Sequence, residues 1–182
     1  AKTASKNGFK TLLVDEKPYL GGSTIYQNSE HFKINNQILS SWLEKEINEI
    51  KKIKNLEIKI RTSVAAFHGY NFLLARENLT DHLPLEQRDN KTRHRLLKVR
   101  AKKVITATGS LERPLIFNNN DPPGILLSSA IDKYANFFGV ACGEKNVLFT
   151  NNDSAYETAI SLYQKGINIE AIIDNREEVD SK

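Results

Sequence analysis

The pattern of hydrophobic and polar positions predicts short strands alternating with helices. The first apolar run, residues 11 to 14 (TLLV), is bounded by charge and is typical of a parallel strand covered on both faces. The residues before it end a helix, with Gly8 at the position after the C-cap. Residues 42 to 54 carry apolar side chains at helical spacing, and Ser40 or Ser41 is placed to cap that helix.

The central part of the pattern changes from parallel to antiparallel. Residues 56 to 64 alternate as a strand, which we expect to lie beside the first strand. From residue 65 to about 103 the pattern predicts a meander of short antiparallel strands, with a tight turn at positions 69 to 71 (GYN). The segment VITATG, residues 104 to 109, then predicts a buried strand ending in small residues.

The C-terminal part predicts a second βαβ unit. A helix with Ser128 or Ser129 as its N-cap ends at Gly139, and the βαβ unit follows over residues 147 to 173, with Gly166 just after the end of its helix. The acid Asp174 comes about 24 positions after the turn at 150 to 152, a spacing that fits a ribose-binding acid. That turn is Thr-Asn-Asn, whose side chains would crowd a pyrophosphate. We therefore interpret this unit as a degenerate one without a nucleotide of its own.

Chemistry-bearing residues gather just after the first strand. Asp15 and Glu16 occupy the end of that strand, where a dinucleotide fold holds the ribose hydroxyls. Gly21 and Gly22 allow close approach of the backbone to a ligand. The ribose acid normally lies roughly 20 residues after a glycine-rich turn, whereas 14 residues precede Asp15. We therefore expect that turn and its strand upstream of Ala1, and interpret the chain, which also lacks methionine, as an internal piece.

Composition excludes several classes of protein. Hydrophobic residues make up 40% and charged residues 26%, as in ordinary globular proteins, and the net charge is +4. The basic residues are dispersed without interleaved aromatics, which favours solvated faces over nucleic-acid binding. A single cysteine excludes an internal disulfide and fits a cytoplasmic protein. No apolar run approaches the roughly 18 residues of a membrane span, and the scattered histidines predict neither a metal site nor a catalytic group.

Four segments carry longer motifs. They are VDEKPYLGGS, RTSVAAFHGYN followed by ENLTDHLP, ATGSLERPLIFNNNDPPGILLSSA, and VLFTNNDSAYETA. In this order, and over nearly the whole chain, they resemble the α subunits of the heterotetrameric sarcosine oxidases. The departures are small: Ser110 and Leu111 replace the usual residues, and Pro122 stands where the family usually has an arginine. That last change puts in doubt any anion contact at position 122.

The resemblance implies an α/β fold, the FAD/NAD(P)-binding Rossmann-like fold of the glutathione-reductase type. An antiparallel β-meander is inserted in it, and part of a second, nested Rossmann-like domain follows. We therefore expect a dinucleotide-binding domain over residues 1 to 117, including the meander at about 65 to 103. A linker and the start of the second, degenerate nucleotide-binding-like domain would occupy residues 118 to 182.

The resemblance also implies an activity for the whole protein. Such an enzyme oxidises sarcosine with oxygen to glycine and hydrogen peroxide, and transfers a one-carbon unit to tetrahydrofolate. The amine is oxidised at FAD in the β subunit, and electrons pass to FMN near the α–β interface. The α subunit holds a noncovalent NAD. This chain would then be the NAD-binding portion, with β, γ and δ subunits as partners and no catalytic residue of its own.

The family motif carries a set of cofactor contacts onto this sequence. The two acids after the first strand hold the ribose, with a lysine beside them. The glycine pair and the serine that follows it approach the pyrophosphate. A valine at the end of the next parallel strand packs on adenine, and a Thr-Gly pair closes the crevice. The implied residues are Asp15, Glu16, Lys17, Gly21, Gly22, Ser23, Val64, Thr108 and Gly109.

Three alternatives stay open at this point. A carboxylate at position 15 disfavours a 2′-phosphate, which leaves NAD or FAD rather than NADP. The protein could instead be a related amine or amino-acid dehydrogenase subunit, similar to hydrogen cyanide synthase or opine dehydrogenase. It could also be a non-catalytic scaffold that retains the dinucleotide fold for subunit assembly. The sequence does not give the amine substrate.

Overall fold

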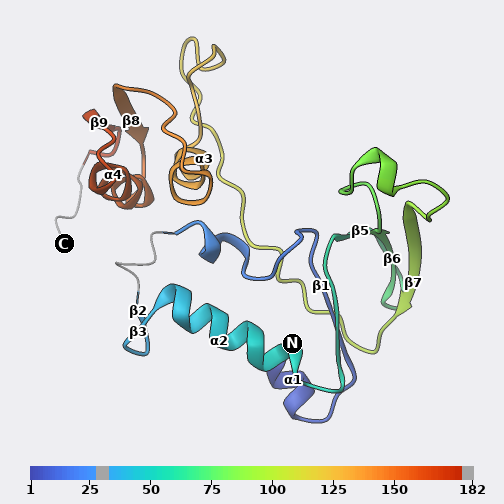
Figure 1. Cartoon of the computed structure of the whole chain (residues 1–182). Coiled ribbons are helices and arrows are strands. Elements are labelled where there is room, and N and C mark those ends of the chain that lie inside the picture. Colours follow the sequence, from blue (N-terminus) through green and yellow to red (C-terminus); the bar gives the residue numbers. More distant parts are fainter. Residues whose placement is uncertain (28–32, 178–182) are drawn as a thin grey trace. The chain divides into compact units, whose positions relative to one another are not determined.

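The computed structural model describes residues 1–27 and 33–177, and its fold is mixed α/β. The chain divides into two compact units, shown within Figure 1. The first comprises Ala1–Gly22 and Ser40–Gly109, and the second comprises the described residues of Ser23–Leu39 and Ser110–Lys182. The first unit therefore ends at Gly109, before the expected domain boundary at residue 117. The assignment of the two domains to nucleotide binding remains a prediction.

A parallel pair of strands forms the base of the first unit. Strand β1 (Thr11–Val14) has the predicted bounds and pairs in parallel with β4 (Leu56–Lys59). Parallel neighbours of this kind need a crossover between them, here through α2 (Leu39–Lys51). In the described part of the chain, no strand pairs with the other edge of β1.

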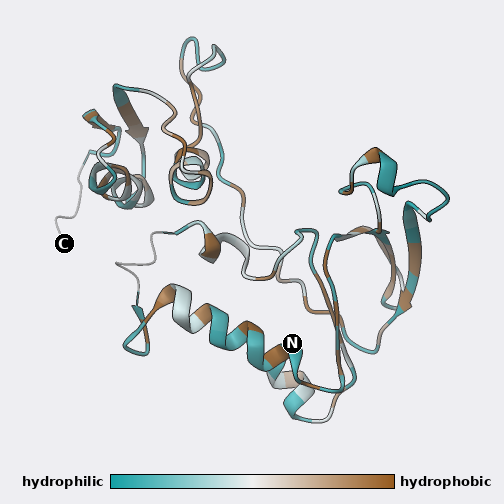
Figure 2. Cartoon of the chain, viewed as in Figure 1, coloured by the Kyte–Doolittle hydropathy of each residue, from teal (hydrophilic) through white to brown (hydrophobic). Residues whose placement is uncertain are grey.

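Two helices of this part meet through ion pairs. Helix α1 (Lys2–Lys6) ends as expected: Asn7 is its C-cap and Gly8 follows with a φ of 83°. Lys2 Nζ lies 2.8 Å from carboxylate oxygens of both Glu46 and Glu49 on α2. Figure 2 shows hydrophobic and hydrophilic residues mixed along α2, as an amphipathic helix requires.

Helix α2 starts and ends three residues earlier than its predicted bounds. Ser40 and Ser41 therefore lie inside its first turn and do not precede it, so the predicted cap is wrong. Asn55 lies four residues after the end of the helix. The side-chain amide of Asn55 donates to the carbonyl oxygens of Ser5 (2.8 Å) and Phe9 (2.9 Å), which ties the segment after the helix to α1.

The predicted single strand over residues 56 to 64 is interrupted. Arg61 adopts left-handed backbone with a φ of 50°, which breaks the extended conformation between β4 and β5 (Thr62–His68). The Arg61 N–H donates to the Lys17 carbonyl and the Thr62 N–H to the Asp15 carbonyl, both at 2.9 Å. The meander therefore starts at Thr62, next to the end of β1, and the prediction of one continuous strand was wrong.

The meander itself is confirmed as a three-stranded antiparallel sheet. Strand β6 (Phe72–Asn78) lies between β5 and β7 (His94–Arg100), as Figure 1 shows. The predicted turn joins β5 to β6, with positive φ at Tyr70 (58°) and Asn71 (53°). A short 3₁₀ turn, Leu85–Gln87, lies in the loop between β6 and β7.

Residues 104 to 109 do not form the predicted strand. They have no regular secondary structure and pair with no strand among the described residues, and the side chain of Ile105 is 82% exposed. A strand requires backbone hydrogen bonds to a neighbour as well as a β-favouring sequence. The composition of this segment supplies only the second condition, so the expectation of a buried strand was wrong.

The second unit contains a short hairpin that the sequence did not predict. Strands β2 (Lys33–Ile34) and β3 (Gln37–Ile38) pair antiparallel after the 3₁₀ turn Gly22–Ile25. The two residues between them, Asn35 and Asn36, have φ of 50° and 61°. Asparagine tolerates the left-handed conformation that a two-residue hairpin turn of this kind needs at both positions.

A helical segment and the βαβ unit complete the second unit. Helix α3 (Ser128–Lys133) continues into a π-helical turn, Tyr134–Phe138, and ends at Gly139 with a φ of 66°, as predicted. Strand β8 (Asn146–Thr150), α4 (Ser154–Gln164) and β9 (Ile169–Asp174) form the predicted βαβ unit.

The core of the second unit lies between α4 and its two strands. Figure 2 shows hydrophobic residues along β8. Leu162 is fully buried on α4. Leu148, Ala155 and Ala159 form a buried cluster, and the partly buried Ile169 packs against it. Within the described residues, no helix combines the length and apolar character that crossing a bilayer requires.

A candidate nucleotide site and an adjoining pocket

Asp15 lies at the carboxyl end of β1, as the motif predicts. Its backbone N–H donates to the Lys59 carbonyl at 2.9 Å, which continues the parallel pairing of β1 with β4 by one residue. Its side chain is half-buried, and Oδ1 accepts the Lys17 N–H at 2.9 Å in a local turn. Among the described residues no hydrogen bond reaches Oδ2, so one carboxylate oxygen is available to a sugar hydroxyl.

Glu16 and Lys17 are held less firmly than Asp15. Their side chains pair with each other at 3.1 Å, with exposed fractions of 64% and 46%. An exposed pair of this kind contributes little to stability and exchanges readily with other partners. The structure therefore places both residues beside Asp15 but gives neither a fixed binding geometry.

The glycine pair after β1 is required by the backbone conformation. Gly21 and Gly22 have φ of 126° and 58°, which residues with a Cβ rarely adopt. A Cβ added at Gly22 would meet no atom within 4 Å, so conformation and not space is the constraint there. Ser23 belongs to the second unit, and the structure describes it only within that unit.

The remaining predicted contacts lie on β5 and after the meander. Val64 is 48% exposed on β5 and pairs with Ala75 of β6. Thr108 and Gly109 are exposed, and Gly109 has a φ of 74°. No described hydrogen bond joins these three residues to Asp15, although the Thr62 N–H, two residues before Val64, donates to the Asp15 carbonyl at 2.9 Å. The set as a binding site stays a prediction.

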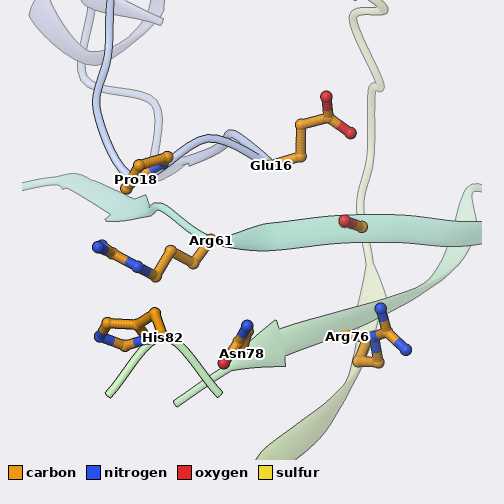
Figure 3. A pocket seen from close by; sticks show the side chains of 7 residues that line it. Glu16, Pro18, Arg61, Arg76, Asn78 and His82 are labelled. Atoms are coloured by element: carbon orange, nitrogen blue, oxygen red, sulfur yellow. The ribbon is translucent and has the colours of Figure 1, made fainter. Parts of the chain in front are cut away.

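An open pocket of about 300 Å³ lies in the first unit, next to the turn after β1 (Figure 3). Glu16 is the predicted site residue that lines it. The other side chains come from the β4–β5 junction, from β5 and β6, and from the loop after β6. The lining residues are Glu16, Pro18, Arg61, Ser63, Arg76, Asn78 and His82.

Sequence reasoning missed most of this pocket, although one signal was present. Ser63 on β5 lies directly opposite Arg76 on β6 in the antiparallel register, so both side chains leave the same face of the sheet. Asn78 is two residues beyond Arg76 and shares that face. The polar residues at the start of β5 and at the end of β6 could have been placed together once the register was known.

The acid of the second βαβ unit has partners within the protein. Asp174 accepts hydrogen bonds from the guanidinium group of Arg176 (2.7 Å to Nη2) and from the Tyr156 hydroxyl (3.0 Å). Arg176 also pairs with Asp153 at 2.8 Å. The Arg176 hydrogen bonds hold the pKa of Asp174 well below its usual range, against the opposing effect of burial. Asp174 is thus a structural ion-pair partner here.

The start of α3 shows why a predicted cap was wrong. Leu127 occupies the N-cap position, and neither Ser128 nor Ser129 caps the helix with its side chain. Instead, Glu112 accepts the Ser128 N–H (3.1 Å), the Ser128 hydroxyl (2.8 Å) and the Ser129 N–H (2.8 Å). Burial alone would raise the pKa of Glu112, but the hydrogen bonds from Ser129 and Ser128 outweigh it and lower that pKa.

Asp132, the acid within α3, joins this helix to α4. Asp132 Oδ1 accepts hydrogen bonds from the Ser161 hydroxyl (2.8 Å) and the Asn136 amide (2.6 Å). Burial raises the pKa of Asp132, although both hydrogen bonds oppose the rise. In the part of the chain that the structure describes, no cluster of three or more potential metal ligands occurs.

Curated relatives match the chain along nearly its whole length, although no family model matches it. The sarcosine oxidase subunits alpha of Corynebacterium sp. strains P-1 and U-96 are 34% and 33% identical over 181 residues, or 100% of this chain. That of Rhizobium meliloti strain 1021 is 32% identical over 97% of this chain. Over the segment that it spans, the chain is similar to these sarcosine oxidase alpha subunits.

The chain covers only a small part of these alpha subunits. It spans 18% of the length of the two Corynebacterium proteins and 17% of the Rhizobium protein. A solved structure described as L-proline dehydrogenase from P. horikoshii is also similar. It is 25% identical with a TM-score of 0.67, and the match covers 97% of this chain and 33% of that one. This similarity supports the mixed α/β fold and links the alpha subunit segment to a second oxidoreductase.

Proposed function

We propose that this chain is the NAD-binding part of a sarcosine oxidase alpha subunit, with a Rossmann-like fold of the glutathione-reductase type. The observation that carries the proposal is the position of Asp15 at the carboxyl end of a parallel strand, with Oδ2 free to accept a hydrogen bond. Dinucleotide folds use an acid in this position to hold the ribose hydroxyls. The unpaired edge of β1 among the described strands fits a further strand that would carry the pyrophosphate turn.

The other predicted residues have supporting roles in this proposal. Gly21 and Gly22 turn the chain after β1 in a conformation that brings backbone close to a ligand. Glu16 and Lys17 flank the ribose, Ser23 approaches the pyrophosphate, and Val64 packs on adenine. Thr108 and Gly109 close the crevice on the far side. NAD would be held at this site as a bound dinucleotide, and none of these residues would transfer a proton or an electron.

The whole protein would act as an oxidoreductase on CH–NH donors. The names of the relatives support an alpha subunit that works in a complex. In our proposal its partners are β, γ and δ subunits, and the complex acts in the cytoplasm. Oxidative demethylation of sarcosine, with peroxide formation and one-carbon transfer to tetrahydrofolate, is the reaction we propose for that complex. The FAD and FMN that the reaction needs would be bound outside this segment.

The similarity to a proline dehydrogenase keeps a related activity as the second candidate. In that case the complex would dehydrogenate another amine or amino acid, and the site at Asp15 would hold FAD or another adenine nucleotide. The adenosine contacts would be the same in both cases, because they involve only the ribose and the adenine. The amine substrate would then be decided by a different part of the complex.

A titration of the full-length alpha subunit tests the proposal. NAD, FAD and NADP are added separately, and binding is followed by calorimetry. We expect one equivalent of NAD to bind, with NADP at least about tenfold weaker because the Asp15 carboxylate repels a 2′-phosphate. Tight binding of FAD alone favours the second candidate. Binding by none of the three rejects the nucleotide site.

A further inference from the structure

We propose that the pocket beside Glu16 binds a phosphate group, either free phosphate or a small phosphate monoester, through Arg61 and Arg76. The pocket lies within the first unit, and its volume of about 300 Å³ suits a small anionic molecule. Its residues differ from those proposed to hold NAD, apart from Glu16. The variants at Arg61 and Arg76 therefore leave the proposed NAD contacts in place.

The guanidinium groups of the two arginines, Arg61 and Arg76, make no hydrogen bond or ion pair within the described part of the chain. Other arginines of the same unit have partners: Arg88 donates to the Leu83 carbonyl at 2.7 Å, and Arg93 pairs with Asp81 at 2.9 Å. Both arginines line the pocket, at opposite ends of it in Figure 3, and their donors are unused.

The acidic side chain in the lining does not neutralise these cations. The Glu16 carboxylate pairs with Lys17 at 3.1 Å. Figure 3 shows that carboxylate directed away from the Arg61 guanidinium. The pocket therefore carries an excess of positive charge, which an anion would balance. A guanidinium group matches the oxygens of a phosphate with two parallel N–H donors, so phosphate is the anion that this chemistry favours.

Neutral donors complete the pocket. The Asn78 Oδ1 accepts the Asp81 N–H at 2.9 Å, which fixes the amide and leaves its Nδ2 as a donor. Ser63 contributes a hydroxyl group on the same face of the sheet, and His82 contributes a ring nitrogen. In Figure 3 the side chains of Arg61 and His82 lie at one end of the pocket and Arg76 at the other, with Asn78 between them.

The backbone around the pocket is held in place before any ligand binds. The Asn78 N–H donates to the Arg61 carbonyl, and the Arg61 N–H donates to the Lys17 carbonyl, both at 2.9 Å. These bonds tie the end of β6, the β4–β5 junction and the turn after β1 to one another. Binding would therefore require ordering of side chains but little rearrangement of the backbone, which lowers its entropic cost.

The experiment measures binding of inorganic phosphate and of glycerol phosphate to the full-length alpha subunit by calorimetry. The test variants are Arg61→Gln and Arg76→Gln, and the control is Arg100→Gln. This control removes the same charge from β7 of the same sheet. Arg100 lies over the ring of Phe72, outside the pocket. Glutamine at position 61 keeps the cost of the left-handed backbone unchanged, because it also carries a Cβ.

We expect the wild type and Arg100→Gln to bind phosphate with a Kd below about 1 mM, and both test variants to bind at least about tenfold more weakly. Equal binding of glycerol phosphate would identify a monoester site, and binding of inorganic phosphate alone a site for the free ion. Absence of binding in the wild type, or equal weakening by Arg100→Gln, overturns the proposal. The Asp15→Ala variant should still bind phosphate, and Arg61→Gln should still bind NAD.

Discussion

The Glu112 carboxylate accepts a 2.8 Å hydrogen bond from the backbone N–H of Ser129, 17 positions further along the chain. Together with the contacts to Ser128, this side chain satisfies donors at the start of α3 that the helix itself cannot satisfy. The extended segment before α3 is thereby fastened to the helix within the second unit.

Replacing Glu112 with alanine should destabilise the second unit by about 1–2 kcal/mol, the usual cost of losing a helix cap. Hydrogen exchange of the α3 amides in the full-length protein measures this loss. Because the pKa of Glu112 is lowered on folding, its contribution is present above the unfolded carboxyl pKa of about 4.3 and is lost as the pH falls through the folded value. The Glu144→Ala variant removes an exposed glutamate of the same unit, and equal effects would contradict the prediction.

The Asp132→Asn variant should become more stable, relative to the wild type, as the pH rises. The folded pKa of Asp132 is raised by burial, so its protonated form is favoured by folding and that contribution is lost as the pH rises through the folded value. Asparagine keeps the oxygen that accepts from Ser161 and Asn136. Urea denaturation between about pH 4 and pH 7 should show a growing difference of less than about 1 kcal/mol. A difference that shrinks with pH would refute this sign.

The Leu162→Ala variant should cost about 3 kcal/mol of stability, because it leaves a cavity at a fully buried position of α4. Ile160 provides a matched control on the same helix, since its side chain is 56% exposed. We expect Ile160→Ala to cost less than about 1 kcal/mol. Hydrogen exchange of the β8 and β9 amides reports both changes, and a similar loss in the two variants would show that α4 packs differently.

The Asp15→Ala variant should weaken NAD binding at least about tenfold, because the ribose loses a charged acceptor. Glu57→Ala is the control: it removes an exposed carboxylate from the neighbouring strand β4. Calorimetry gives the affinity, and a turnover assay of the assembled complex gives its consequence. Loss of NAD with assembly and turnover intact would favour the scaffold interpretation of this segment.

The Asp174→Ala variant should leave the number of bound NAD molecules unchanged. Asp174 is occupied by Arg176 and Tyr156, so no sugar contact is lost with it. The variant should instead destabilise the second unit and leave Arg176 with Asp153 as its remaining partner. Equilibrium dialysis gives the stoichiometry. A fall in bound nucleotide would mean that the second βαβ unit has a binding role after all.

Much of this fold could be predicted because its signals are local. Strand β1 has the bounds that its apolar run indicates, and α4 ends where Gly166 takes a φ of 76°. The end of α3 at Gly139 was predicted for the same reason. In each case a short apolar pattern and a glycine at a left-handed position are sufficient, and no distant residue is needed.

The missed features depend on residues that lie far apart in sequence. The cap of α3 comes from Glu112, at a distance that no local motif covers. The segment 104 to 109 has a strand composition but lacks a paired neighbour among the described strands. The pocket needs the register of β5 against β6 before Ser63 and Arg76 can be placed together. Asp15 was found because its signal, an acid directly after a strand, is again local.

The left-handed Arg61 has a consequence for how this segment tolerates insertions and deletions. From Thr62 to Val64, before the register shift between Val64 and Ala66, the residues of β5 alternate between the two sides of the sheet, and this alternation is set by the position of Arg61. Removing one residue there would exchange odd for even positions, so that Val64 would take the side of Ser63. Insertions or deletions next to Arg61 in related proteins should therefore change the chain by two residues at a time.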